Sequence, residues 1–332
     1  MIPVYPMALA PRYVERVWGG TGLFRALGRR KASRRRIGES WEVSGLAGAE
    51  SRVRNGPLRG LPLSRAIALD PAAFLGERVV AARGAEMPLL VKYVAAEDDL
   101  SIQVHPDDRG ARELEGEPRG KTEAWHVIAA RKGAVIWLGL RRGAVRDRRH
   151  LRELARTGRI AGALRRFAVS KGETYFIPAG TVHAIGRGVI VLEVQQSSDR
   201  TYRLFDWGRA GLDGKPRELH VEKAAAVADL RGSRGAGRVA PAAVGPGRER
   251  LVSCRAFSVE RWRAERGAAV TRPLRGRFAA ILVTEGSAVV EAGSAGFAAR
   301  RGDAVFVPAA AREVSVRVPS AGRGATLVAI AP

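Results

Sequence analysis

The sequence predicts a mainly β protein with two consecutive β-barrels and a few helices inserted in or flanking the first barrel. Three observations support this fold class. Short runs rich in Val, Ile, Tyr and Trp recur along the chain, two stretches of helical periodicity interrupt them, and one Gly-x5-Pro pattern occurs in both halves. The 332 residues, 46% of them hydrophobic, are enough to fill two such cores.

The β-type runs are six to nine residues long, and most are bounded by Gly, Pro or Asp. Examples are SWEVSG, PLLVKYVAA, LSIQVH, EAWHVIAA and GVIVLEVQQ. Their composition is typical of strands, and their regular recurrence indicates an antiparallel sandwich or barrel.

Two stretches, residues 61–83 and 146–167, predict helices instead. The second carries apolar residues that fall near one helical face, with arginines on the other. Those apolar residues are Leu151, Leu154, Ile160, Leu164 and Phe167.

A Gly/Pro-rich segment without periodicity, residues 237–250, predicts a linker. It divides the chain into a metal-binding catalytic domain with helical insertions, residues 1–236, and a smaller β domain, residues 251–332.

The first copy of the repeated pattern extends further than the second. Gly172 is followed by five residues, then Pro178, one residue, Gly180, two residues and His183. A turn at the glycine, a short strand and a proline where pairing ends would explain the spacing. The four positions match the second signature of the cupin family.

The second copy keeps Gly302 and Pro308 but has Ala310 and Glu313 where the second glycine and the histidine should be. It therefore resembles a cupin that has lost its metal. Tandem cupin (jelly-roll) barrels, one catalytic and one degenerate, are the expected architecture.

Candidate metal ligands converge on the first barrel. Gln103 and His105 stand at i and i+2 of a predicted strand and so point the same way. Glu123 and His183 would complete the set. Two imidazoles, a carboxylate and an amide oxygen suit a borderline ion such as zinc, one per chain.

The other three histidines are weaker candidates for metal ligands. His126 shares a strand with Glu123 at odd spacing, so its side chain should face the opposite way. His150 falls on the arginine-rich helix, and His220 stays ambiguous between a structural role and the site.

Charge and cysteine content limit which other classes of protein this chain could belong to. A net charge of +24 suits an anionic metabolite, but the arginines are scattered and no nucleic-acid-binding motif is visible. With Cys254 alone, no internal disulfide is possible. No secretory signal or membrane-length apolar run is visible. We expect a cytoplasmic monomer or weak homodimer with neither nucleic-acid nor membrane partners.

Five stretches together resemble the type I phosphomannose isomerases of the cupin superfamily, particularly their short bacterial form. They occur in the family's order over the N-terminal two thirds of the chain. They are Gly38–Ser44, Pro88–Asp108, Gly120–Ile128, Phe176–Ile185 and Leu192–Arg209.

The resemblance implies interconversion of mannose 6-phosphate and fructose 6-phosphate by zinc-assisted proton transfer through a cis-enediol. It implies zinc ligation by the four residues already chosen. It also implies a substrate pocket lined by Lys92, Ser101, Lys121, Glu193 and Arg203. In that pocket Lys92 and Ser101 would bind substrate.

The resemblance leaves the proton-abstracting group open. Lys121, Glu193 and a metal-bound water are the candidates, and the chemistry favours Lys121 because a nearby cation disfavours its charged form. Arg203 would hold the phosphate or the developing charge. Some long-form members have a histidine where this chain has Gly120.

Two other functions fit a metal cupin less well. An iron-dependent oxygenase favours two histidines with a glutamate, or three histidines, and open positions for oxygen, and Gln103 argues against it. A sugar-binding or regulatory cupin without activity would lack an intact ligand set.

Overall fold

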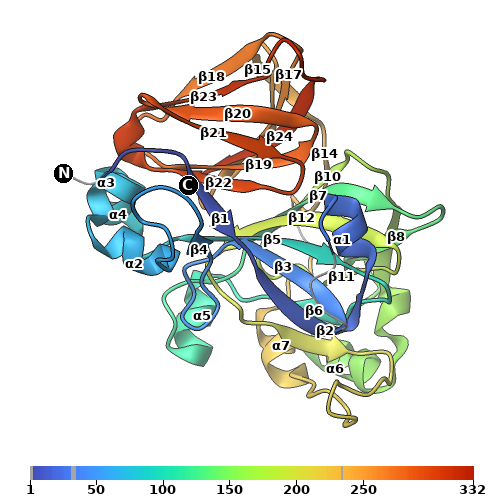
Figure 1. Ribbon diagram of the computed structural model, residues 1–332. Coiled ribbons are helices and arrows are strands. Elements are labelled where there is room, and N and C mark those ends of the chain that lie inside the picture. Colours follow the sequence, from blue (N-terminus) through green and yellow to red (C-terminus); the bar gives the residue numbers. More distant parts are fainter. Residues whose placement is uncertain (1–2, 31–34, 233–234) are drawn as a thin grey trace.

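A computed structural model describes residues 3–30, 35–232 and 235–332 of the chain. It confirms a mainly β protein, in which an N-terminal and a C-terminal β unit are stacked (Figure 1). Each unit pairs a larger antiparallel sheet with a smaller one. Within the described residues neither unit closes into a continuous hydrogen-bonded barrel.

The N-terminal unit has a seven-stranded and a five-stranded sheet. The larger sheet runs in the order β14 (Gly237–Val239), β10 (Thr174–Ile177), β7 (Glu123–Ala130), β12 (Val189–Gln196), β5 (Leu89–Ala95), β3 (Ile37–Val43), β2 (Arg12–Gly20). The smaller runs in the order β13 (Tyr202–Phe205), β6 (Ile102–Val104), β11 (His183–Ile185), β8 (Val135–Leu140), β9 (Leu164–Ala168).

The C-terminal unit pairs an eight-stranded with a four-stranded sheet. The larger has the order β15 (Ala242–Gly245), β16 (Arg248–Ser253), β17 (Ser258–Ala264), β24 (Ala325–Ala331), β19 (Ala279–Glu285), β22 (Ala304–Val307), β1 (Met7–Ala10), β4 (Arg52–Val53). The smaller has the order β18 (Ala269–Pro273), β23 (Glu313–Arg317), β20 (Ser287–Ala292), β21 (Ala295–Arg300). Strands β1 and β4 thus carry the start of the chain into the C-terminal sheet.

The segment 237–250, which its composition predicted as a linker, carries two short strands. It contains β14, which pairs with β10 in the N-terminal unit, and β15, which pairs with β16 in the C-terminal unit. The chain therefore passes between the units within Ala240–Pro241. Pairing with neighbouring strands overrides the low local propensity of this segment.

The first predicted helix, residues 61–83, is in fact three short ones: α2 (Leu63–Ala68), α3 (Pro71–Leu75) and α4 (Glu77–Arg83). Asp70 caps α3 by accepting a hydrogen bond from Ala73 N, and Pro71 stands at its first position. Gly76, with φ of +99°, separates α3 from α4.

The second predicted helix also ends early. It comprises α6 (Arg148–Arg156) and a 3-10 turn, Arg159–Ala163, after which Leu164 and Phe167 belong to strand β9. The remaining helices are α1 (Gly22–Leu27), α5 (Asp108–Glu115) and α7 (Val221–Val227), and a second 3-10 turn spans Ala309–Ala311.

The interiors of the two units differ. The C-terminal unit is filled by aliphatic side chains such as Ile281, Val316 and Leu327. A further apolar cluster spans the junction of the units, where Tyr93 of β5 belongs to the same core as Phe306 of β22. The N-terminal unit instead buries a group of charged side chains, described below.

The two copies of the Gly-x5-Pro pattern form similar hairpins. Gly172 and Gly302 have φ of +87° and +90°, each before a strand that ends at a proline. After the second copy Glu313 is exposed and lies outside the interior of its unit.

His126 faces away from the metal-ligand candidates and toward the junction of the two units. It lines a cavity there with Lys171 and Arg261, and its Nδ1 lies 3.0 Å from Thr174 Oγ1. Burial, together with Arg261 and Arg263, lowers the pKa of His126 to about 4.

This shift predicts an acid-sensitive contribution to stability. Because the folded-state pKa lies below the unfolded value, the neutral ring stabilises the fold above about pH 6.5, and that stabilisation is lost as the pH falls toward 4. Between pH 7 and pH 5 we expect His126→Asn to lose about 2 kcal/mol less unfolding free energy than the wild type. Urea titrations at both pH values would measure this, with His150→Asn as control; equal losses would contradict it.

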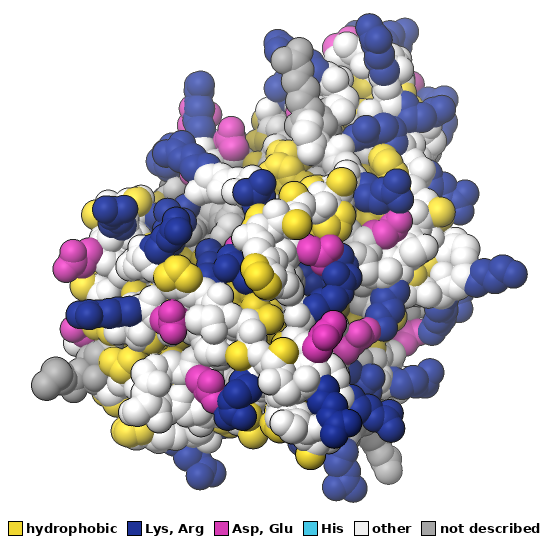
Figure 2. Space-filling view, turned by 90° about the horizontal axis from the view of Figure 1, so that it is seen from above, with side chains coloured by type: hydrophobic (Ala, Val, Ile, Leu, Met, Phe, Trp, Pro, Cys, Tyr) yellow, Lys and Arg dark blue, Asp and Glu magenta, His cyan; other side chains and the backbone are white. Residues whose placement is uncertain are grey.

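None of the helices in the described part of the chain is long and apolar enough to span a membrane. On the face shown in Figure 2, Lys and Arg side chains spread over the whole surface with Asp and Glu between them. The positive charge of the chain is therefore not gathered in one patch on this face.

Candidate metal centre and active-site cavity

The candidate metal ligands lie on three neighbouring elements of the N-terminal unit. In the five-stranded sheet Gln103 of β6 pairs directly with His183, the first residue of β11. His105 follows β6, and Glu123 opens β7 of the opposite sheet. Residues 80 positions apart are thus brought side by side by strand register.

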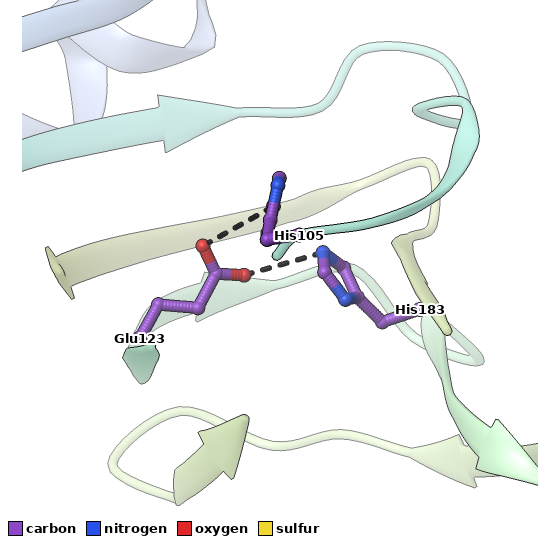
Figure 3. Close-up of side chains that lie close together, drawn as sticks. All are labelled: His105, Glu123 and His183. Carbon is purple, nitrogen blue, oxygen red and sulfur yellow. Dashed lines mark ion pairs between the residues drawn. The ribbon is translucent and has the colours of Figure 1, made fainter. Parts of the chain in front are cut away.

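Three of these side chains converge closely. Glu123 places Oε1 3.2 Å from His183 Nε2 and Oε2 3.6 Å from His105 Nε2 (Figure 3). Each side chain is 1% exposed, and the three possible ligand atoms lie within 4.8 Å of one another. This is a buried cluster of two imidazoles and one carboxylate.

The orientation of both rings fits metal binding. His105 Nδ1 lies 2.8 Å from the carbonyl oxygen of Arg200, and His183 Nδ1 lies 2.8 Å from that of Thr181. Hydrogen bonds from Nδ1–H to these carbonyls leave each Nε2 as the lone-pair donor facing Glu123.

The carboxylate gives the strongest sign that a cation belongs here. Both oxygens of Glu123 are buried and accept no hydrogen bond in the described structure. Burial, and then the charge of Glu193, raise the pKa of Glu123 to about 7, although Lys121 opposes the shift. A buried carboxylate without hydrogen bonds is costly, and a bound cation would compensate it.

Gln103 completes the centre on one side. Its Nε2 lies 3.4 Å from His183 Nε2, while its Oε1 accepts a hydrogen bond of 3.1 Å from Ser101 Oγ. The two ends of an amide are exchanged by a half-turn, which would aim Oε1 at the histidines. Ser101 therefore acts on the side-chain orientation of Gln103.

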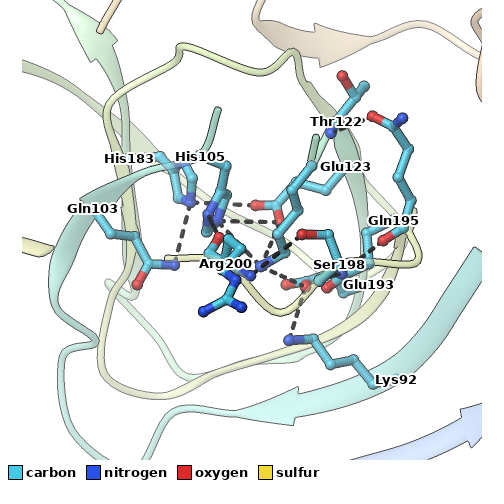
Figure 4. A network of polar contacts seen from close by, with 12 residues as sticks. Lys92, Gln103, His105, Thr122, Glu123, His183, Glu193, Gln195, Ser198 and Arg200 are labelled. Carbon is cyan, nitrogen blue, oxygen red and sulfur yellow. Dashed lines mark hydrogen bonds and ion pairs between the residues drawn. The ribbon is translucent and has the colours of Figure 1, made fainter. Parts of the chain in front are cut away.

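Lys121 lies beside the cluster and is 3% exposed. Figure 4 shows the polar side chains of this region, among them His105, Glu123 and Glu193. Its Nζ is 3.1 Å from His105 Nε2, 3.3 Å from Glu123 Oε2 and 3.8 Å from Glu193 Oε1. An ammonium or amine at this point faces both the metal centre and the second buried carboxylate.

Glu193 belongs to a ladder of alternating charges on the seven-stranded sheet. Lys92 Nζ lies 3.1 Å from Glu193 Oε1 and 3.8 Å from Glu39 Oε2, and Trp125 donates to Glu193 Oε2 at 3.1 Å. Burial alone would raise the pKa of Glu193, but Lys92 and Lys121 hold it below its usual value. Glu193 is therefore an ionised base at neutral pH.

Gly120, the position of the long-form histidine, has no room for a side chain. A Cβ there would lie 2.3 Å from the backbone carbon of Asp107. A histidine at this position would require the two segments to separate.

A cavity of about 410 Å³ leads from the metal centre to the surface. Its size falls in the range of about 300–1,000 Å³ that is usual for small-molecule sites. The predicted residues in its lining are Lys92, Gln103, Lys121, Glu193 and Arg203. Ser101 is absent from the lining and reaches the cavity only through Gln103.

The structure also adds residues that the sequence did not single out. Trp18 and the guanidinium-bearing residues Arg16 and Arg217 line the outer part of the cavity. In a chain with 57 lysines and arginines no local pattern marks these two. His220 lies behind Arg203, whose backbone N donates to His220 Nδ1 at 3.4 Å, and so stands apart from the metal centre.

Comparison with known proteins agrees with this geometry. The family model for the phosphomannose isomerase type I catalytic domain matches residues 7–125. A mannose-6-phosphate isomerase of Streptococcus mutans is 33% identical over 91% of this chain and 92% of its own length. The probable mannose-6-phosphate isomerase GmuF of Bacillus subtilis is 40% identical over 67% of this chain and 68% of its own length.

Solved structures extend the similarity over the whole chain. The crystal structure of the mannose 6-phosphate isomerase from Bacillus subtilis superposes with a TM-score of 0.86 and 31% identity, covering 98% of this chain and 99% of that one. The apo form of the Salmonella typhimurium enzyme, at 19% identity and a TM-score of 0.78, shares the fold. The chain belongs to the type I phosphomannose isomerase family and is an isomerase.

Proposed function

We propose that this chain interconverts mannose 6-phosphate and fructose 6-phosphate by zinc-assisted proton transfer through a cis-enediol. The observation that carries the proposal is the buried, unbonded carboxylate of Glu123 between two imidazoles, with Lys121 and Glu193 beside it. The choice of mannose 6-phosphate as substrate is supported by the family to which the chain belongs and by the names of its relatives.

Gln103, His105, Glu123 and His183 would hold one zinc ion. One carboxylate and three neutral ligands leave the centre with net positive charge, which stabilises negative charge developing on the sugar oxygens. The remaining chemistry falls to the side chains of the cavity.

The reaction moves one proton from C2 to C1 of the open-chain sugar and one from O2 to O1. When a base removes the C2 proton, the electron pair of that bond forms the C1–C2 double bond and the carbonyl electrons pass to O1, which takes up a proton to give the cis-enediol. The base then returns its proton to C1 as O2 loses its proton and the C2 carbonyl forms. We assign this abstraction to Lys121, whose Nζ lies between the candidate ligand His105 and Glu193 at the inner end of the cavity lining. Glu193, an ionised carboxylate 3.8 Å from Lys121 Nζ, is the alternative base.

Lys92 and Ser101 would bind and orient the substrate and the side chains around it. Lys92 is fixed between Glu39 and Glu193, so it sets the charge and position of Glu193. Arg203 differs from both, because its Nε is buried without a hydrogen-bond partner and the side chain lines the cavity. An unpaired guanidinium there can bind phosphate oxygens or the developing enediolate.

Replacing Arg203 with alanine is expected to lower kcat/KM for mannose 6-phosphate by about a hundredfold, which corresponds to roughly 3 kcal/mol for a charge-assisted contact. Steady-state kinetics would measure the loss. An unchanged kcat/KM would remove Arg203 from the site.

A coupled isomerase assay with mannose 6-phosphate, run with chelator and with zinc or iron restored, tests the proposal directly. Activity that is lost with chelator and recovered with zinc supports it. Inactivity under all conditions would contradict it. Oxygen uptake with iron instead would favour an oxygenase, the reading against which Gln103 argues. We further propose that the enzyme works in the cytoplasm as a monomer or weak homodimer.

A further inference from the structure

The rim of the active-site cavity carries a small hairpin between β13 and α7. Ala210 and Pro216 form an antiparallel bridge, and Gly211 N donates to Lys215 O at 2.6 Å. Continuing the same pairing outward by one residue places Arg209 opposite Arg217. Two like charges facing each other across a hairpin are destabilising, so this arrangement needs a compensating partner.

Asp206 is the partner that holds the two arginines together. Arg209 Nη2 donates to Asp206 Oδ1 at 2.8 Å, and Arg217 Nη1 lies 3.1 Å from the same oxygen. Asp206 itself is 5% exposed. One buried carboxylate therefore fixes two guanidinium groups at the rim.

The ring of Trp18 packs against the same arginines. The guanidinium carbon of Arg217 lies 5.0 Å from the ring centroid, that of Arg209 5.8 Å and that of Arg16 5.9 Å. Stacking on Trp18 leaves the remaining N–H groups of Arg217 directed along the plane of its guanidinium. Trp18 and Arg217 both line the cavity.

Arg217 and Arg203 are close enough to repel each other. Burial, and then the charge of Arg203, lower the pKa of Arg217 to about 10, so both groups remain charged at neutral pH. Their repulsion is only partly offset by Asp206. Asp199 of the cavity lining also acts on Arg203, but the two guanidinium groups together can still bind the charged oxygens of a dianionic phosphate.

Other cations near the cavity are already committed. Arg16 makes two contacts with the carboxylate of Glu39, at 2.8 and 3.2 Å, and Lys92 is held by two carboxylates. Arg209 is shared between Asp206 and Asp98. Arg217 and Arg203 are left with N–H groups to offer, at the end of the cavity away from Glu123.

We propose that Arg217 binds the phosphate of the substrate together with Arg203. Asp206 is the positioning residue that holds Arg217 in place. Arg217 would thereby make the enzyme selective for hexose phosphates over neutral hexoses. The inference rests on the proposed function, because it assigns the phosphate end of the same substrate.

The test compares Arg217→Gln and Asp206→Asn with a control, Arg250→Gln. Arg250 is an exposed residue of the C-terminal sheet, on β16. Initial rates would be measured with mannose 6-phosphate and with unphosphorylated mannose at high concentration. For Arg217→Gln we expect KM for the phosphosugar to rise about ten- to a hundredfold. The rate with mannose should stay unchanged, and Asp206→Asn should show a smaller shift in the same direction.

A second readout does not depend on turnover. Calorimetric titration of the zinc-loaded enzyme with inorganic phosphate should show binding about tenfold weaker or more in Arg217→Gln than in the Arg250→Gln control. An active wild type with equal phosphate affinity and equal KM in both variants would overturn the inference and leave the isomerase proposal intact. A wild type that binds phosphate but isomerises nothing would overturn the proposed function instead.

Discussion

Replacing His183 with alanine is expected to abolish isomerase activity, by at least about a thousandfold in kcat/KM, and to lower bound zinc below one equivalent. His183 Nε2 faces Glu123 Oε1 at 3.2 Å, and its Nδ1 is fixed by the Thr181 carbonyl oxygen. Removing the ring deletes one ligand and leaves the buried carboxylate with less compensation. Kinetic assays and elemental analysis of the same preparation would measure both effects.

His150→Ala is the matched control for this variant, because His150 lies on α6, away from the metal centre. It should keep activity and zinc content. Far-ultraviolet circular dichroism of both variants would show whether the fold is kept. Normal turnover of a folded His183→Ala enzyme would end the metal hypothesis, since His105 is the one other histidine of the cluster within the described residues.

Changing Lys121 should produce the second large loss, about 10²- to 10⁴-fold in kcat, if it transfers the proton. Lys121→Arg is the informative variant. It keeps the positive charge beside His105 and Glu123, but a guanidinium stays protonated and cannot act as a base. Because the ligands are untouched, zinc content should remain near one equivalent.

Glu193→Gln separates the two candidate bases. If Lys121 abstracts the proton, Lys121→Arg should lose far more activity than Glu193→Gln. Near-normal kcat in Lys121→Arg, with a collapse in Glu193→Gln, would transfer the role to Glu193. Glu193→Gln keeps the size of the side chain, and its amide oxygen can still accept from either Lys92 or Trp125, although not from both.

Some features follow from the sequence by itself. Strand-length runs fix the mainly β class, and the two glycines at 172 and 302 fix the hairpins because each needs a positive φ. The alternation of strand side chains puts Gln103 and His105 on one side and turns His126 away from Glu123. These are local consequences of backbone geometry, and family resemblance then supplies the pairing of distant segments.

Other features were decided only by tertiary structure. Local propensity suggested a long helix where Pro71 and Gly76 break it, and a linker where β14 and β15 pair with their sheets. The entry of β1 into the C-terminal sheet depends on partners almost 300 residues away, as Met7 pairs with Phe306.

At the rim of the cavity, too, the functional residues could not be identified from the sequence alone. Arg217 looks like any other arginine in the sequence, and only the fold places it against Trp18 and Asp206, beside Arg203. Local dihedral preferences act over a few residues, so the sequence alone determines them. Charge compensation, strand pairing and close approach, such as that of Gly120 to Asp107, act through space and are set by the assembled fold.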